Sequence, residues 1–189
     1  MKQRFLVGID EVGRGALAGP LVIGAAAGFW NKENKKLLKG IRDSKKLTFK
    51  RKEEWFSKLK KSRLIFYTVS IPNQLIDKKG ISWVLKTGVV RILKKFQRRP
   101  DLILLDGGLR APKKYRQKTV IKGDEKIPII AAASIYAKVR RDRLMAKLDS
   151  KYLYGFKDHK GYGTKKHFQS IKKNGLSRFH RRSFLKKIK

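Results

Sequence analysis

The chain has 189 residues, 41% of them hydrophobic, which suits one folded domain with a sizeable core. Fifty lysines and arginines against 14 aspartates and glutamates give a net charge of +36, so a polyanion, above all nucleic acid, is the expected partner. The lack of cysteine excludes disulfides, zinc–thiolate sites and thiol nucleophiles, and no segment approaches the roughly 20 apolar residues that cross a bilayer. These properties predict a cytoplasmic protein without membrane contact.

The first half of the chain predicts the element order β-β-α-β. Residues 4–9 and 20–29 are β-rich runs separated by glycines, a pattern typical of an antiparallel pair. A helix is expected over residues 48–61, with Thr48 as its N-cap. The run over residues 63–71 then predicts a third strand.

The second half continues the alternation of helix and strand. Apolar residues between positions 81 and 96 fall on one helical face, and residues 102–105 are apolar on both faces, as in a strand buried inside a sheet. A strand near residues 118–122 and a helix from about 130 to 149 follow. The order of the elements indicates an α/β fold.

Acidic residues are scarce, and three of them stand at strand ends. Asp10 and Glu11 close the first strand, and Asp106 closes the buried strand 102–105; glycines follow both sites. If these two strands are neighbours in one sheet, the three carboxylates form a charge cluster that a hard cation would neutralise. A turn or helix cap remains the alternative reading of either aspartate taken alone.

The combination of features favours metal-assisted phosphodiester hydrolysis. Oxygen ligands suit Mg²⁺ or Mn²⁺, and two such ions about 4 Å apart activate a water and stabilise the leaving oxygen. The large surplus of cations would hold the phosphate backbone of the substrate.

Eight short segments together resemble the ribonuclease HII family, in the family's order and across nearly the whole chain. They are Gly8-Ile-Asp-Glu-Val-Gly-Arg-Gly15, Gly19-Pro-Leu-Val22, Asp43-Ser-Lys-Lys-Leu47, Leu104-Leu-Asp-Gly107, Lys122-Gly-Asp124, Ala131-Ala-Ala-Ser-Ile-Tyr-Ala-Lys-Val-Arg-Arg-Asp142, His159-Lys-Gly-Tyr-Gly-Thr164 and His180-Arg-Arg-Ser-Phe184. The resemblance implies a ribonuclease H-like mixed sheet flanked by helices. We expect a catalytic domain over residues 1–150 and a short basic helical extension over 151–189 packed on it, with Thr164 and Gly175 as caps of one helix.

The resemblance also implies an activity and its metal ligands. Asp10, Glu11, Asp106 and Asp124 would be the catalytic residues and would bind Mg²⁺ or Mn²⁺; Asp124 is assigned by the resemblance alone. The expected substrates are RNA–DNA hybrids and duplex DNA with embedded ribonucleotides. Cutting on the 5′ side of the ribonucleotide would leave 3′-hydroxyl and 5′-phosphate ends, as in ribonucleotide excision repair and DNA replication. We expect a monomer.

Recognition of the ribose is expected from the glycine loop and one tyrosine. In the family, the backbone of the loop Gly13, Arg14 and Gly15 is understood to bind the 2′-hydroxyl, while Tyr162 stacks on the adjacent deoxyribose. An ordinary tight turn is the alternative for the glycines, and simple packing is the alternative for the tyrosine.

Several cations and one serine are candidate phosphate contacts. They are Arg14, Lys45, Lys46, Ser134 and Lys138, although a lysine in a chain this basic is usually a solvated charge. Asp142 is expected to form a structural ion pair with its helical neighbours Arg140, Arg141 or Arg143 rather than to bind metal.

Two segments depart from the family pattern. Residues 79–90 lack the usual Asn-Ile…Ala-Met pattern, which puts substrate contacts from that helix in doubt, and Gly175-Leu-Ser177 replaces a Gly-Pro pair.

A non-catalytic basic nucleic-acid-binding protein of ribosomal type is the main alternative interpretation of the sequence. Within the enzymes, ribonuclease HIII would show Gly-Lys-Gly after the acidic pair, and ribonuclease HI spaces its first acids far apart.

Overall fold

The computed structural model describes residues 3–41, 47–152 and 154–185. Its elements in chain order are β1 (Phe5–Val12), β2 (Leu21–Phe29), α1 (Lys32–Leu37), α2 (Phe49–Lys60), β3 (Ile65–Ile71), α3 (Asn73–Lys79), α4 (Ile81–Leu93), β4 (Leu102–Asp106), β5 (Gln117–Val120), α5 (Gly123–Lys126), α6 (Pro128–Tyr152), α7 (Phe156–His159), α8 (Lys165–Asn174) and α9 (Arg182–Leu185).

The strands form one mixed sheet in the order β3-β2-β1-β4-β5. β1 and β2 are antiparallel, as predicted, and β2 pairs antiparallel with β3. β4 crosses over from β3 at the far edge and pairs parallel with β1, so the two strands that carry the acids are neighbours; β1 continues two residues past Asp10, to Val12. β5 adds a further parallel strand next to β4.

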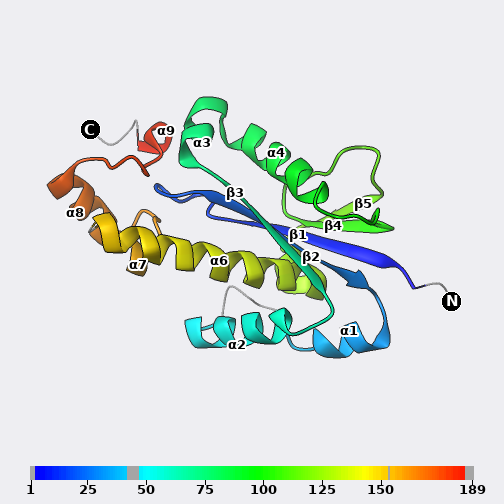
Figure 1. The fold of residues 1–189 in the computed structure, drawn as a ribbon. Helices are drawn as coiled ribbons and strands as arrows, with labels where there is room; N and C mark the ends of the chain where they lie inside the picture. The colour runs from blue at the N-terminus through cyan, green and yellow to red at the C-terminus, as the bar shows by residue number, and fades with distance from the viewer. Residues whose placement is uncertain (1–2, 42–46, 153, 186–189) are drawn as a thin grey trace.

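Helices cover both faces of the sheet (Figure 1). α3 and α4 pack on one face, where the predicted apolar stripe of α4 is buried, and α6 packs on the other with α1 and α2. α6 approaches the sheet closely: a Cβ on Gly8 would lie 2.4 Å from the carbonyl oxygen of Ile129, and one on Gly24 would lie 2.6 Å from the Cβ of Ala137. The missing side chains therefore let the long helix lie directly against the two central strands.

The longer predicted elements agree with the structure, and their ends differ by a few residues. The Thr48 side chain caps α2 by accepting a hydrogen bond of 3.3 Å from the N–H of Arg51, as expected. β5 ends at Val120, and the turn that follows places Lys122 in the left-handed region at φ 54°. α6 begins at Pro128, two residues before the expected start at about 130. The sequence missed α1, α3, α5, α7 and α9, all shorter than eight residues, because so few residues show little periodicity.

The C-terminal segment packs on the loop between β1 and β2. Ala18 and His180 form an isolated antiparallel bridge, and the Asn73 side-chain amide donates to the carbonyls of Arg178 and His180. Thr164 caps α8 as predicted, and Gly175 follows its last turn.

The division into a catalytic domain over residues 1–150 and an extension over 151–189 stays a prediction. In the described ranges, no helix has the length and apolar character needed to cross a membrane.

Candidate active site

One cavity of about 300 Å³ gathers most of the predicted site residues at the ends of β1 and β4. Its lining includes two of the carboxylates on β1 and one on β4, the glycine loop after β1, two polar residues of α6 and the tyrosine before α8. These residues are Asp10, Glu11, Asp106, Gly13, Arg14, Gly15, Ser134, Lys138 and Tyr162, joined by Val12, Ile135 and Lys52. The cavity therefore has an acidic wall, and cations from three separate segments complete its lining.

The parallel register of β1 and β4 explains why the acids meet. Ile9 pairs with Leu105, so the next residues along the two strands, Asp10 and Asp106, stand side by side at the same sheet edge. Asp10 is only 3% exposed, while Glu11 and Asp106 are half-buried.

Burial raises the pKa of the Asp10 carboxyl well above its ordinary value. A hydrogen bond from the Ser134 side chain acts in the opposite direction, and the negative charges of Asp106 and Glu11 raise the pKa further. Ser134 therefore contacts a carboxylate of the acidic cluster, and its predicted contact with a phosphate stays a prediction.

Asp124 lies beside this cluster but does not line the cavity. It is fully buried in α5, and the residue before it, Gly123, donates its N–H to Asp106 Oδ1 at 2.5 Å. In the part of the chain that is described, no three acidic or histidine side chains surround a common point closely enough to enclose an ion. The chemistry of the donors still suits a hard cation, since three carboxylates line one cavity and a fourth is buried next to it.

The glycine loop needs its first glycine for two reasons. Gly13 has φ +87°, and a Cβ there would lie 2.2 Å from Nε of the buried Arg141. A Cβ on Gly15 would instead meet no atom within 4 Å, so this residue faces open space in the cavity. Between them, the half-exposed Arg14 places Nη1 at 3.6 Å from Glu11 Oε1.

Tyr162 stands on the side of the cavity formed by α6. Its half-buried ring lies 5.8 Å from Lys138 Nζ and 5.5 Å from the guanidinium carbon of Arg141. The ring therefore has cations near it and one side turned to the cavity, an arrangement compatible with packing and with stacking on a sugar.

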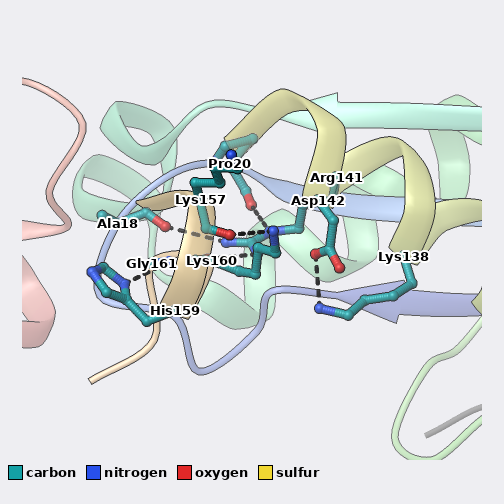
Figure 2. A network of polar contacts seen from close by, with 9 residues as sticks. All are labelled: Ala18, Pro20, Lys138, Arg141, Asp142, Lys157, His159, Lys160 and Gly161. Carbon is teal, nitrogen blue, oxygen red and sulfur yellow. Dashed lines mark hydrogen bonds and ion pairs between the residues drawn. The ribbon is translucent and has the colours of Figure 1, made fainter. Parts of the chain in front are cut away.

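Asp142 holds Lys138 in place. The Lys138 ammonium donates to Asp142 Oδ1 at 2.8 Å, one helical turn away, and Asp142 is 6% exposed (Figure 2). The expected pairing of Asp142 with a neighbouring arginine is wrong: Arg143 pairs with Glu53, and Arg141 donates to backbone carbonyls. The helix turns Arg141 and Arg143 toward other partners than Asp142.

Lys52 is a site residue that the sequence reading missed. It lies on α2 and lines the cavity; its pKa is lowered by burial and then by the charge of Lys138. The signal was present, because position 52 falls on the same helical face as the buried Phe56 and Leu59, where a lysine is out of place. The predicted contacts Lys45 and Lys46 lie outside the described residues.

A five-stranded mixed sheet flanked by helices, with acids at adjoining strand ends, defines a nuclease of the ribonuclease H class. Residues 7–187 match the family model of ribonuclease HII. The ribonuclease HII of Caldicellulosiruptor bescii is 40% identical over 98% of this chain and 88% of its own length. The chain belongs to the ribonuclease HII family.

Solved structures agree with this assignment. The ribonuclease H2 of Pyrococcus horikoshii is 31% identical, with a TM-score of 0.77 over 95% of this chain and 93% of its own. The ribonuclease HII of Archaeoglobus fulgidus, solved in a complex with PCNA, is 28% identical, with a TM-score of 0.78 over 94% of this chain and 93% of its own. The ribonuclease H-like fold is thus confirmed, and so is the prediction of an endonuclease acting on RNA–DNA hybrids, against the non-catalytic alternative.

Proposed function

We propose that the enzyme cuts the phosphodiester on the 5′ side of a ribonucleotide, in hybrids and in duplex DNA with embedded ribonucleotides. The products would carry a 3′-hydroxyl and a 5′-phosphate. The observation that supports this best is that one cavity is lined by the carboxylates of β1 and β4 together with the glycine loop and Tyr162. Such a cavity combines a site for cutting a phosphodiester with groups that distinguish a ribose from a deoxyribose.

The metal ligands in this proposal are Asp10, Glu11 and Asp106, with Asp124 as the fourth. Mg²⁺ or Mn²⁺ bound there would activate the attacking water and stabilise the leaving oxygen. The protein's part is to keep the carboxylates together. Burial of Asp10, its contact with Ser134 and the anchoring of Asp106 by Gly123 all serve that purpose.

The cationic wall of the cavity would hold the substrate strand. Burial lowers the pKa of Lys52 on α2, and the charge of Lys138, which is fixed by Asp142, lowers it further. Asp142 forms an ion pair with Lys138 and acts on Lys52 through its charge alone, which leaves positive charge for a phosphate oxygen. Arg14 in the loop and Tyr162, which also lines the cavity, would place the ribonucleotide and its neighbour.

The decisive experiment uses a DNA duplex with one ribonucleotide and a matched all-DNA duplex, each incubated with the enzyme and Mg²⁺ or Mn²⁺. We expect one cut, on the 5′ side of the ribonucleotide, and an intact control. Cleavage of both duplexes, or a cut on the 3′ side, would contradict the proposal. The monomeric state, the cytoplasmic location and the part played in repair and replication stay predictions.

A further inference from the structure

Two fully buried arginines hold the loop that joins β1 to β2. Arg181, from the C-terminal segment, donates from Nη1 to the carbonyl of Arg14 at 2.9 Å and from Nε and Nη2 to the carbonyl of Gly19 at 3.1 and 3.0 Å. Arg141, from α6, donates to the carbonyls of Pro20, Lys160 and Ala18 (Figure 2). Both side chains are 0% exposed.

These guanidinium groups are costly to bury. Within the described part of the chain, neither forms an ion pair with a carboxylate, and the acceptors of their hydrogen bonds are backbone carbonyls. Burial lowers the pKa of Arg181 to about 10, and the nearby charge of Arg141 contributes to the same shift. The planar guanidinium carries five N–H donors in a fixed geometry and can bind several carbonyls at once, which gives these positions a reason to be arginine.

The carbonyl that Arg181 binds determines where the neighbouring N–H points. The described chain has no cis peptide bond, and in a trans peptide the C=O and the next N–H point in opposite directions. The Arg14 carbonyl is turned inward to Arg181, so the N–H of Gly15 is turned away from it. Gly15 lines the cavity, and among the described residues no acceptor takes a hydrogen bond from this N–H.

Backbone pairing keeps Arg181 in register with the loop. The Arg181 N–H donates to the carbonyl of Leu17 at 2.7 Å, and the Gly19 N–H donates to the carbonyl of Phe179 at 2.9 Å. The loop and the C-terminal segment are thus joined by main chain and side chain together. Displacement of either segment would release the Arg14–Gly15 peptide.

We propose that Arg181 is a positioning residue for RNA recognition: it fixes the Arg14–Gly15 peptide so that the Gly15 N–H faces the 2′-hydroxyl of the substrate. This inference rests on the proposed function, and it gives the C-terminal segment a part in selecting the substrate. Arg181 itself does not line the cavity. It acts through the loop, so its loss should change selectivity more than general affinity for duplex DNA.

The test compares Arg181→Lys with Arg182→Lys, a matched control at the exposed neighbouring position, both in full-length protein carrying Asp106→Asn to prevent cutting. Dissociation constants are measured with Mg²⁺ for a duplex with one ribonucleotide and for the same duplex in DNA. The preference for the ribonucleotide is the dissociation constant of the all-DNA duplex divided by that of the ribonucleotide duplex. This ratio should fall by about tenfold in Arg181→Lys, which corresponds to the free energy of one hydrogen bond. It should be unchanged in Arg182→Lys, and all-DNA affinity should be similar throughout, since every variant keeps its charge.

The outcomes separate the two ideas. If the Asp106→Asn parent shows no preference for the ribonucleotide, the proposed recognition of the 2′-hydroxyl fails. If the parent shows the preference and folded Arg181→Lys keeps it in full, the role of Arg181 alone is overturned. A loss of all-DNA affinity equal to the loss of ribonucleotide affinity would overturn it too, because that pattern marks a general structural role.

A second measurement covers the case in which Arg181→Lys does not fold. Hydrogen exchange of the unmodified protein should protect the amides of residues 16–19 and 179–181, which donate hydrogen bonds, as one unit that opens together, while the Gly15 amide exchanges freely. Rapid exchange across the loop while the C-terminal segment stays protected would show that Arg181 does not order the loop, and would overturn the proposal without any variant.

Discussion

The carboxylate of Asp106 accepts a hydrogen bond of 2.5 Å from the backbone N–H of Gly123. This contact joins the end of β4 to the first turn of α5, and it brings the backbone of Asp124 next to the acids of the sheet. Asparagine at position 106 keeps an oxygen for the Gly123 N–H but loses the negative charge. The substitution Asp106→Asn therefore tests the role of the negative charge with little change in the fold.

Asp106→Asn should lower the cleavage rate by more than about 100-fold. Substitution of a residue that only hydrogen-bonds to a metal ligand usually lowers activity 10- to 100-fold, and loss of a ligand should have a larger effect. Binding to a ribonucleotide-containing duplex should change little, since affinity comes from the cationic surface. Single-turnover cleavage and a binding titration measure the two effects. Asp158→Asn, an exposed acid outside the cavity, is the matched control and should cut normally. Equal rates in both variants would remove Asp106 from the catalytic set.

Metal binding should raise the melting temperature of the protein. A ligand at 100 times its dissociation constant stabilises the folded state by about 2.7 kcal/mol, provided that it does not bind the unfolded chain. Calorimetric scans with and without Mg²⁺ or Mn²⁺ should show the shift in unmodified protein and a much smaller one in Asp10→Asn. Asp124→Asn is the informative variant. A shift as large as that of the unmodified protein would mean that this buried carboxylate is not a ligand.

Lys52→Met should weaken substrate binding rather than the chemical step. We expect KM to rise by about tenfold with a smaller change in kcat, and the slope of log affinity against log salt to decrease by about one, as for the loss of one phosphate contact. Lys60→Met, an exposed position on the same helix, is the control. If both variants show the same small change in KM and salt slope, Lys52 belongs to the general cationic surface.

Mild acid should destabilise the protein through its histidines. His167 stacks on His159 with ring centres 4.2 Å apart and places Nε2 at 3.1 Å from Nε2 of His180. Burial lowers the pKa of His167 from 6.5 to about 4 and also lowers the pKa of His180. Between pH 6.5 and 4 the unfolded chain binds protons that the folded chain excludes, so the free energy of unfolding falls as pH falls through that window.

Urea denaturation at pH 7.5, 6 and 5 measures this effect. The loss of stability on acidification should be reduced in His167→Gln, which cannot take up the proton in either state. An identical pH profile in this variant and in the unmodified protein would assign the acid sensitivity to other groups.

The strand ends were predictable because their chemistry is local. Asp10, Glu11 and Asp106 each follow an apolar run in the sequence, and the parallel register of β1 and β4 then brings them together. Asp124 follows no such run. Its place beside Asp106 depends on the turn at Lys122 and on the Gly123 hydrogen bond, and only the family resemblance indicated it.

The contacts that sequence reasoning missed join distant segments. Lys52 reaches the cavity because α2 packs near α6, and Arg181 binds a loop at the other end of the chain. Composition cannot show such partners. The pairing of Asp142 with Lys138 was missed for another reason: three arginines adjacent in sequence looked like better partners than a lysine one turn away.

The hydrogen bond between Arg181 and Arg14 spans 167 positions of the chain. During synthesis the ribosome makes β1, β4 and α6 before it adds the residue that fixes the loop. We therefore expect the groups that cut to be assembled earlier than the contact that orients the loop, and closure of so long a span to come late in folding. The last step of folding would then be formation of the contact that lets the enzyme distinguish a ribonucleotide from DNA.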